Sequence, residues 1–306
     1  MLQAGFPRLN GHSRGISKLD RLNWAEGIAV IAYGVRIGIR ANQPGVIAQY
    51  LPSLPPSWKL AGSPLVERLY SIIAGGESKR RGLQLSHLIY ANGERLIRVP
   101  QFEQAADVFE GDVQLYVAEM SPRRVFVHAG VVGWRGKAVV IPGRSFSGKT
   151  TLTAALVKAG CAYYSDEYAV LDAGGRVHPY ARLLGIRERG QSERATRYTV
   201  ESLGGKRGAT PLPVALVIVS QYKPGATWRP RRLSAGEGAL AMLENTVSAR
   251  REPQAALATL RRVVAESLVL KGRRGETQQV VDFILNTLKK NAGNPVDNTA
   301  LEGYNR

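Results

Sequence analysis

Cysteine is almost absent from the chain, because Cys161 is the only one among 306 residues. A single thiol excludes an intramolecular disulfide framework and any zinc site built from several cysteines. The chain also lacks an apolar run of about eighteen residues, the length that can cross a membrane as a helix. Its first twenty residues are basic and have no apolar core of the kind found in signal peptides. We therefore expect a cytoplasmic protein without contact to a membrane.

Acidic residues are scarce relative to basic ones. The chain has 42 Lys and Arg against 24 Asp and Glu, a formal charge of +18. Residues 1–120 hold 13 basic and 10 acidic residues, and residues 121–306 hold 29 and 14, so the excess belongs to the second part. A positive charge of this size predicts an anionic ligand or partner. Its location favours a triphosphate and an acidic acceptor, with nucleic acid as the less favoured alternative.

The remaining composition is that of a globular protein. Hydrophobic residues make up 44%, with 33 Gly and 16 Pro, which excludes a collagen-like, coiled-coil or wholly disordered chain. Residues 1–22 are polar and basic, and we expect them to form a flexible arm. A smaller α+β domain is predicted over residues 23–120. Its expected elements are strands over 27–39 turning at Tyr33-Gly34, a short helix from Pro64 to Ala74, a hairpin at Asn92-Gly93 and a helix from Phe102 to Met120.

A second domain is predicted over residues 121–290, followed by a polar tail over 291–306. Two apolar strands open it, over 125–134 and 138–143, and a helix follows that begins at Lys149 and ends before Gly160. The uninterrupted apolar segment 213–222 indicates a central strand that is buried on both faces. The other expected elements are strands over 162–165, 168–172 and 267–270, a helix from the capping box Ser234–Glu237 to about Ser248, a helix from Pro253, and a last helix over 275–290.

A phosphate-binding loop links the strand over 138–143 to the helix that follows it. Gly143-Arg144-Ser145-Phe146-Ser147-Gly148-Lys149-Thr150 matches G-x-x-x-x-G-K-[ST] at every fixed position. In such a loop the backbone N–H groups turn toward a polyphosphate, and the lysine neutralises the outer phosphates. Thr150 is expected to place its hydroxyl on Mg²⁺. We predict that residues 143–151, which include Thr151, bind a nucleotide; the alternative is a glycine-rich turn with an incidental lysine.

Two adjacent carboxylates, Asp166 and Glu167, follow one helix and one strand after the loop. Neighbouring side chains at a strand end point to opposite sides. One carboxylate can therefore face a metal ion while the other faces an attacking nucleophile. This arrangement predicts Asp166 as a general base toward a hydroxyl and Glu167 as a ligand on the Mg²⁺ side. The alternative is a solvated acidic turn between two strands.

His128 is a polar residue within the apolar strand over 125–134. We interpret it in two ways: as a partner that hydrogen-bonds Asp166 and orients it, or as a structural histidine satisfied by some other neighbour. His178 is expected to act in a turn.

About 45 residues, from His128-Ala129-Gly130 through the loop and its helix to the strand after Asp166-Glu167, resemble the HPr kinase/phosphorylase family in one register. The catalytic domain of that family is also similar to phosphoenolpyruvate carboxykinase. The resemblance extends weakly to Arg187. It implies a P-loop kinase domain with a mixed sheet and flanking helices, ATP and Mg²⁺ as cofactors, and self-association into a homo-oligomer. Mapped onto this chain, it makes Asp166 the catalytic base, puts Glu167 in the metal region and leaves His128 as the histidine before the loop.

The chain differs from that family at two positions. Glu167 stands where the family has a second aspartate, and Gly185 stands where it has a further acidic metal ligand before Arg187. The resemblance therefore implies the kinase reaction and leaves both a reverse phosphorylase reaction and the acceptor open.

The predicted function is transfer of the γ-phosphoryl group of ATP to a serine-type hydroxyl on a protein, peptide or small molecule. Lys149, the loop amides and Mg²⁺ spread the developing charge, and Asp166 takes the proton. Arg187, Arg273 and Arg274 are candidates for phosphate or substrate contacts, with solvated surface arginines as the alternative. Two other functions stay open: a P-loop nucleotide hydrolase or switch, and a non-catalytic nucleotide-binding regulatory protein.

Overall fold

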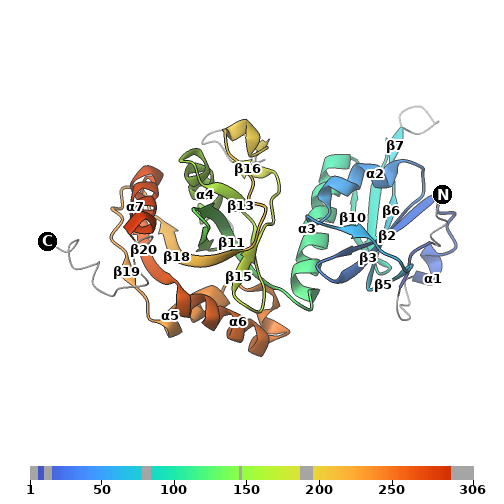
Figure 1. Cartoon of the computed structure of the whole chain (residues 1–306). Coiled ribbons are helices and arrows are strands. Elements are labelled where there is room, and N and C mark those ends of the chain that lie inside the picture. Colours follow the sequence, from blue (N-terminus) through green and yellow to red (C-terminus); the bar gives the residue numbers. More distant parts are fainter. Residues whose placement is uncertain (1–5, 10–15, 78–83, 145–146, 187–195, 291–306) are drawn as a thin grey trace. The chain divides into compact units, whose positions relative to one another are not determined.

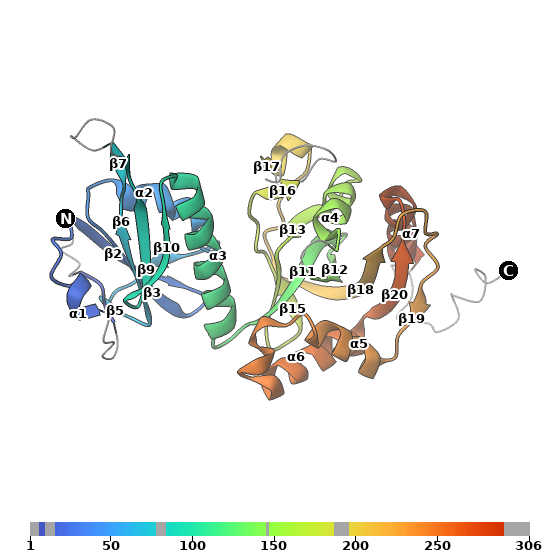
Figure 2. The ribbon, with the colours of Figure 1, turned by 180° about the vertical axis from the view of Figure 1, so that it is seen from behind.

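The computed structural model describes residues 6–9, 16–77, 84–144, 147–186 and 196–290. The chain divides into two units, Met1–Arg123 and Arg124–Arg306, and each combines helices with β-sheet (Figures 1 and 2). Of the residues predicted from sequence to act at a site, Ser145, Phe146 and Arg187 lie outside the described residues, as does the tail over 291–306. Within the described part of the chain, no helix combines the length and apolar character needed to cross a membrane.

The first unit is built on a six-stranded sheet with the order β10-β9-β6-β3-β2-β4. Both predicted hairpin turns are confirmed, since Tyr33-Gly34 and Asn92-Gly93 all have positive φ, the conformation of a two-residue turn between twisted strands. Its strands are β1 (Arg8–Leu9), β2 (Glu26–Ala32), β3 (Val35–Ala41), β4 (Lys59–Leu60), β5 (Leu65–Val66), β6 (Arg68–Ile73), β7 (Gly76–Glu77), β8 (Gln84–Leu85), β9 (His87–Ala91) and β10 (Glu94–Val99). Its α-helices are α1 (Ile16–Leu19), α2 (Val46–Tyr50) and α3 (Phe102–Met120), and Leu51–Ser53 form a 3₁₀ turn.

The predicted helix over 64–74 is wrong, because this segment forms β5 and β6. Strand β6 lies between β3 and β9 and is covered on both faces. Leu69 packs with Ala29 and Val66 on one face, and Tyr70 meets Phe109 of α3 on the other, with ring centroids 4.9 Å apart. Successive buried residues hide the two-residue period of a strand, so pattern alone does not distinguish this strand from a helix.

Part of the expected arm over 1–22 is held against this sheet. Strand β1 pairs in parallel with β5, and Pro7 is buried. Gly38 allows this close approach, because a Cβ atom there would lie 2.6 Å from Cβ of Pro7.

Helix α3 has the predicted bounds and anchors the first unit. Phe109 is fully buried and makes edge-on ring contacts with Tyr50 and Tyr70. One turn later, Asp112 accepts hydrogen bonds of 2.6 and 2.8 Å from Nη2 of Arg68. The helix is therefore joined to the sheet by both apolar and charged contacts.

The second unit contains an eight-stranded sheet with the order β12-β11-β14-β15-β18-β20-β19, in which β13 pairs with β11 and β12 also pairs with β18. Strands β12, β18 and β20 run parallel to one another, so their carboxyl ends share one edge. The strands are β11 (Val125–Trp134), β12 (Lys137–Pro142), β13 (Ala162–Ser165), β14 (Tyr168–Leu171), β15 (Arg176–His178), β16 (Leu184–Ile186), β17 (Thr196–Tyr198), β18 (Leu212–Tyr222), β19 (Arg231–Arg232) and β20 (Leu268–Arg274). The α-helices are α4 (Lys149–Lys158), α5 (Ala235–Leu243), α6 (Pro253–Glu266) and α7 (Thr277–Lys290), with 3₁₀ turns at Glu201–Leu203 and Val247–Arg250.

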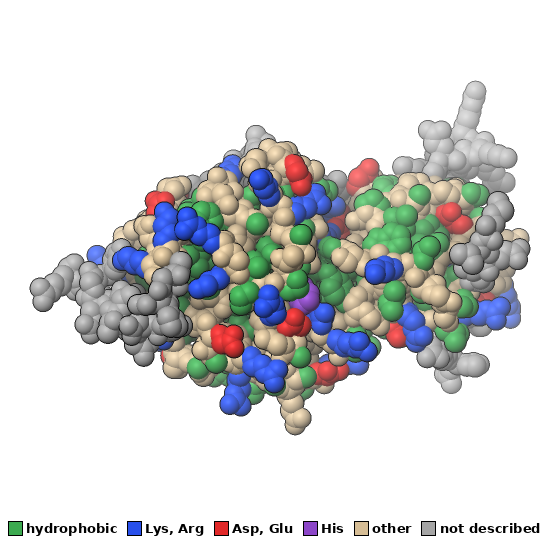
Figure 3. Space-filling model, viewed as in Figure 1, with side chains coloured by type: hydrophobic (Ala, Val, Ile, Leu, Met, Phe, Trp, Pro, Cys, Tyr) green, Lys and Arg blue, Asp and Glu red, His purple; other side chains and the backbone are tan. Residues whose placement is uncertain are grey.

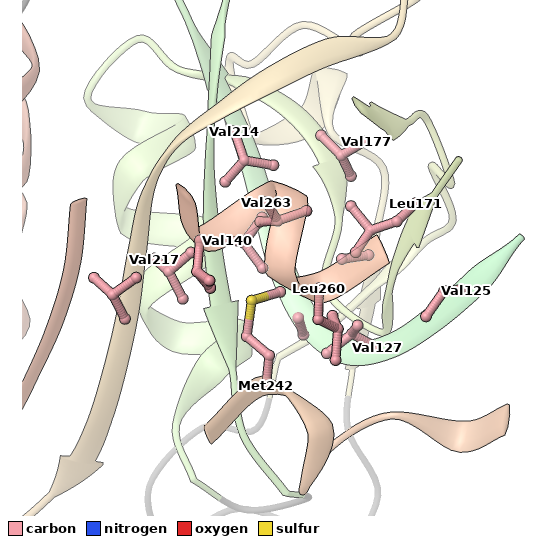
Figure 4. Packing of buried hydrophobic residues seen from close by; sticks show 14 of the residues in the cluster. Val125, Val127, Val140, Leu171, Val177, Val214, Val217, Met242, Leu260 and Val263 are labelled. Carbon is pink, nitrogen blue, oxygen red and sulfur yellow. The ribbon is translucent and has the colours of Figure 1, made fainter. Parts of the chain in front are cut away.

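Helices cover both faces of this sheet. On β12, Ala138 and Val140 belong to the core under α5 and α6, whereas Val139 and Ile141 belong to the core under α4 and α7. Figure 4 shows the first core, in which Met242, Leu260 and Val263 of the helices meet valines of the strands. The prediction that 213–222 is a central strand buried on both faces is confirmed by β18.

Two element ends differ from the prediction. Helix α5 starts at the predicted capping box but ends at Leu243 rather than near Ser248, because Asn245 and Thr246 turn to bond strand β11. Strand β20 continues past residue 270 to Arg274, because it pairs with β18 as far as Tyr222.

Replacing Phe109 by alanine should destabilise the first unit by about 3–5 kcal/mol, since the substitution leaves a cavity between two tyrosine rings. Leu115→Ala is the matched control on the same helix: Leu115 is 50% exposed, and its loss should change stability by no more than about 0.5 kcal/mol. Hydrogen exchange of the α3 amides in increasing urea measures the loss of stability in each of the two variants. Similar losses for the two variants would contradict the packing described for this helix.

Candidate functional site

Strand β11 joins the phosphate loop to the acidic turn through its main chain. The N–H of Gly143 donates to the carbonyl of His128 at 3.1 Å, and the N–H of Ala129 donates to the carbonyl of Glu167, also at 3.1 Å. Strand β11 pairs with both neighbouring strands here: Ala129 lies opposite Pro142 of β12, and Val131 lies opposite Ser165 of β13. Two segments separated by a helix in sequence are thus brought to neighbouring positions on one strand.

The phosphate loop lies between the end of β12 and the start of α4, as the motif requires. Gly148 precedes the helix with φ 83° and ψ 16°, a left-handed conformation that favours glycine. Lys149 begins the helix and is buried, and its Nζ donates to the carbonyl of Arg144 at 3.0 Å. The Oγ atom of Ser147 is buried and has no hydrogen-bond partner in the described part of the chain. An unsatisfied hydroxyl inside this loop fits a phosphate oxygen.

Helix α4 packs closely on β11. A Cβ atom at Gly130 would lie 2.3 Å from Oγ1 of Thr153, so the glycine of the His-Ala-Gly segment is needed for this approach. Thr150 lies in the first turn of the helix, near enough to Asp166 to lower the pKa of that carboxyl, whereas the side chain of Thr151 is exposed. Glycine at residue 130 therefore sets how near the loop lies to the acidic turn.

The acidic turn directs its two carboxylates to different partners. Oγ of Ser165 accepts hydrogen bonds from the N–H groups of Glu167 and Tyr168, at 3.1 and 2.9 Å, which fixes the turn. Oδ1 of Asp166 accepts from the hydroxyl of Tyr163 at 2.7 Å. The two side chains diverge, in keeping with neighbouring positions at a strand end.

Of the two interpretations of His128, the bond to Asp166 is not formed, and the histidine bonds another neighbour, Glu167. Nε2 of His128 lies 3.0 Å from Oε1 of Glu167. The His128 side chain points from strand β11 to the acidic turn and meets Glu167, the more exposed of the two acids. Asp166 is turned inward, toward β13 and α4. The expected turn at His178 is wrong, because His178 ends strand β15 opposite Val170 of β14. Its Nε2 lies 2.7 Å from Oδ2 of Asp172.

Burial and opposite charges shift the ionisation of the central groups. Burial lowers the pKa of Lys149, and the nearby Glu167 and Asp166 partly oppose this effect. Burial also raises the pKa of Asp166, an effect reinforced by Glu167 and opposed by the hydrogen bonds from Tyr163 and Thr150. The ammonium group and the two carboxylates therefore lie close enough to influence one another.

Arg274 is brought to the loop from the far end of the chain. It ends β20, is almost fully buried, and its Nη2 donates to the carbonyl of Gly148 at 2.7 Å. Burial lowers its pKa, and its Nε has no hydrogen-bond partner in the described part of the chain. Arg273 is exposed one residue earlier. Of the candidate arginines, the structure thus places Arg274 against the phosphate loop.

The oxygen donors present fit a Mg²⁺ ion that accompanies a nucleotide. In the described residues no group of three or more His, Cys, Asp and Glu side chains is placed to hold a metal by itself. Mg²⁺ commonly takes only one or two carboxylates and completes its shell with phosphate oxygens and waters. Thr150 and Glu167 supply a hydroxyl and a carboxylate of this type beside the loop.

Tyr163 was not foreseen from the sequence. It is fully buried on β13, and its hydroxyl is the donor to the Asp166 carboxylate. The available signal was a tyrosine on a short apolar strand that ends at two acids, since a buried phenol needs a hydrogen-bond partner.

Comparison of the sequence with models of known protein families and with curated proteins finds no match.

Gly148→Ala should destabilise the second unit more than Gly136→Ala. Both glycines have positive φ, 83° and 78°, so alanine at either position costs about 1–2 kcal/mol. At Gly148 the added Cβ would also lie 2.2 Å from Nη2 of Arg274, whereas at Gly136 nothing lies within 4 Å. Urea unfolding compares the two variants. Equal losses would mean that Arg274 moves away from the loop without cost.

Proposed function

We propose that the chain is an ATP- and Mg²⁺-dependent kinase that transfers the γ-phosphoryl group to a serine-type hydroxyl of a protein, peptide or small molecule. The observation that supports this best is the meeting, on strand β11, of a phosphate loop with a buried lysine and a partly buried aspartate. A loop alone accounts for nucleotide binding. The aspartate beside it adds a group that can accept the proton of an attacking hydroxyl.

The N–H groups of the loop and the start of α4 would bind the phosphates, with Lys149 adding a positive charge. Burial strengthens this interaction, since a charge in a partly desolvated site acts in a lower dielectric than water. Arg274 would support the loop from behind through the Gly148 carbonyl. Thr150 and Glu167 would hold Mg²⁺, which when bound would neutralise charge on the phosphate oxygens.

Asp166 is the proposed base. As the acceptor oxygen forms its bond to the γ-phosphorus, its proton passes to the Asp166 carboxylate, and ADP leaves with the electrons of the broken P–O bond. The raised pKa of Asp166 makes it a better proton acceptor than an ordinary aspartate, provided that it is ionised when the acceptor binds.

The second unit is proposed to have the HPr kinase type of P-loop fold. The order of its parts supports this: a strand with a histidine, a strand and phosphate loop, a helix, then a strand that ends at two acids. The first unit has no proposed role in the chemistry.

Replacing Asp166 by asparagine should abolish most acceptor-dependent transfer, because the amide cannot take a proton. The assay incubates the full chain with γ-labelled ATP and Mg²⁺ together with free serine, HPr-like proteins or cell extract. A fall in kcat of about 100-fold or more is expected from loss of a general base. Asp172→Asn is the control, since this carboxylate lies at the opposite end of β14 from Asp166. Asparagine at 166 with the activity of the parent would refute the assignment of the base.

Two results would favour the other functions. Hydrolysis as fast without an acceptor as with one would indicate a nucleotide hydrolase or switch. Nucleotide binding that Lys149→Ala abolishes, in a parent that transfers no phosphate at any Mg²⁺ concentration, would indicate a non-catalytic nucleotide-binding protein.

Salt should raise the KM for an acidic acceptor and leave kcat nearly unchanged. Lys and Arg side chains are spread over the face of the second unit shown in Figure 3, and residues 121–306 contain 29 basic against 14 acidic residues. Such a field attracts an anion over distances that salt screens, with a Debye length of about 10 Å at 0.1 M. Initial rates measured from low to high KCl give the change in KM. A KM independent of salt would contradict the idea that the positive charge attracts the acceptor.

A further inference from the structure

Tyr163 is held rigidly beside Asp166. Strand β13 pairs with β11, where Tyr163 lies opposite Val132. On its other side, the N–H of Tyr163 donates to the carbonyl of Lys206 and its carbonyl accepts from the N–H of Gly208, both at 2.8 Å. The side chain is fully buried, and the N–H of Arg182 bonds the phenol oxygen. Neither the backbone nor the ring of this residue is free to rotate.

The phenol group has one proton, and Oδ1 of Asp166 receives it at 2.7 Å. The backbone of the turn does not by itself fix the side-chain torsions of Asp166, so its partners decide them. Thr150 also lies near this carboxylate, and its hydroxyl is the one expected to turn to Mg²⁺. Lys149 and Glu167 act on Asp166 through charge, which does not fix the orientation of the carboxylate plane. Tyr163 is therefore the partner that can keep this orientation when nucleotide is bound.

We infer that Tyr163 is a positioning residue for the proposed base: its hydroxyl holds Oδ1 of Asp166, so that Oδ2 is the oxygen left to accept the proton of the acceptor hydroxyl. This role rests on the proposed kinase function. The arrangement follows the general pattern in which a fixed donor orients a catalytic group through its second atom. Tyr163 touches neither nucleotide nor acceptor, and all of its effect passes through Asp166.

The test compares Tyr163→Phe with Tyr164→Phe in the full chain. Tyr164 is the next residue on the same strand, and its hydroxyl also makes a 2.7 Å hydrogen bond, to the carbonyl of Thr210. Each variant loses a phenol hydrogen bond of 2.7 Å, and Tyr163→Phe also loses the bond from the N–H of Arg182. Only residue 163 bonds Asp166. The rates measured are transfer from γ-labelled ATP to L-serine and, without serine, release of inorganic phosphate.

Tyr163→Phe should lower kcat by about 10–100-fold, as is usual when the orienting partner of a functional group is lost. The KM for ATP and the dissociation constant of a fluorescent ATP analogue should stay within about twofold of the parent, because the phosphate loop is untouched. Tyr164→Phe should keep the kcat of the parent. A parent-like kcat in Tyr163→Phe, or equal losses in both variants, would overturn the inference.

A double variant separates positioning from simple destabilisation. If Tyr163 acts through Asp166, Tyr163→Phe has no further effect on the residual rate in the Asp166→Asn background. A general loss of folding would instead lower that residual rate again, and this outcome would overturn the positioning role. A parent that neither transfers nor releases phosphate overturns the proposed function itself, and the role of Tyr163 with it. An active parent with an active Tyr163→Phe overturns the positioning role alone.

Discussion

The site depends on the hydrogen bonds that the main chain of β11 makes at His128 and Ala129. One of them holds the first residue of the phosphate loop and the other holds the acidic turn. Both bonds are made by backbone groups within a paired strand, where donors and acceptors are fixed by the ladder. The main chain therefore sets the spacing between the loop and the carboxylates.

Three charged side chains around the loop are buried or partly buried. Lys149 and Arg274 are almost fully buried and Asp166 is partly so, each at a cost that only opposite charges and hydrogen bonds can offset. Lys149 is offset by two carboxylates and by the Arg144 carbonyl, whereas Arg274 has the Gly148 carbonyl and the ring of Tyr222. Both buried cations therefore lie against one loop, and each is offset by different groups.

Local patterns predicted much of this structure. The hairpin turns at Tyr33-Gly34 and Asn92-Gly93 and the bounds of α3 and α4 follow from residue types within a few positions of each element. The strand over 68–73 did not, because its two buried faces depend on α3 and on β1, which are distant in sequence. Sequence pattern likewise did not predict that His128 bonds Glu167 or that Tyr163 lies beside Asp166. Both contacts lie at the turn after β13, whose place beside β11 is set by strand pairing.

The sequence by itself determined that a loop with the phosphate-binding motif opens a helix and that two acids follow one helix and one strand later, since both are contiguous patterns of residue type. Tertiary structure alone decided which acid turns inward, which one His128 meets, and that Arg274 from the last strand reaches the loop. The physical reason is that the pairing of strands brings together groups 39 and 126 residues apart, and no local preference specifies such a register. Pairing of β13 with β11 brings the acidic turn beside the strand that carries His128, and parallel pairing of β12, β18 and β20 brings their carboxyl ends to one edge.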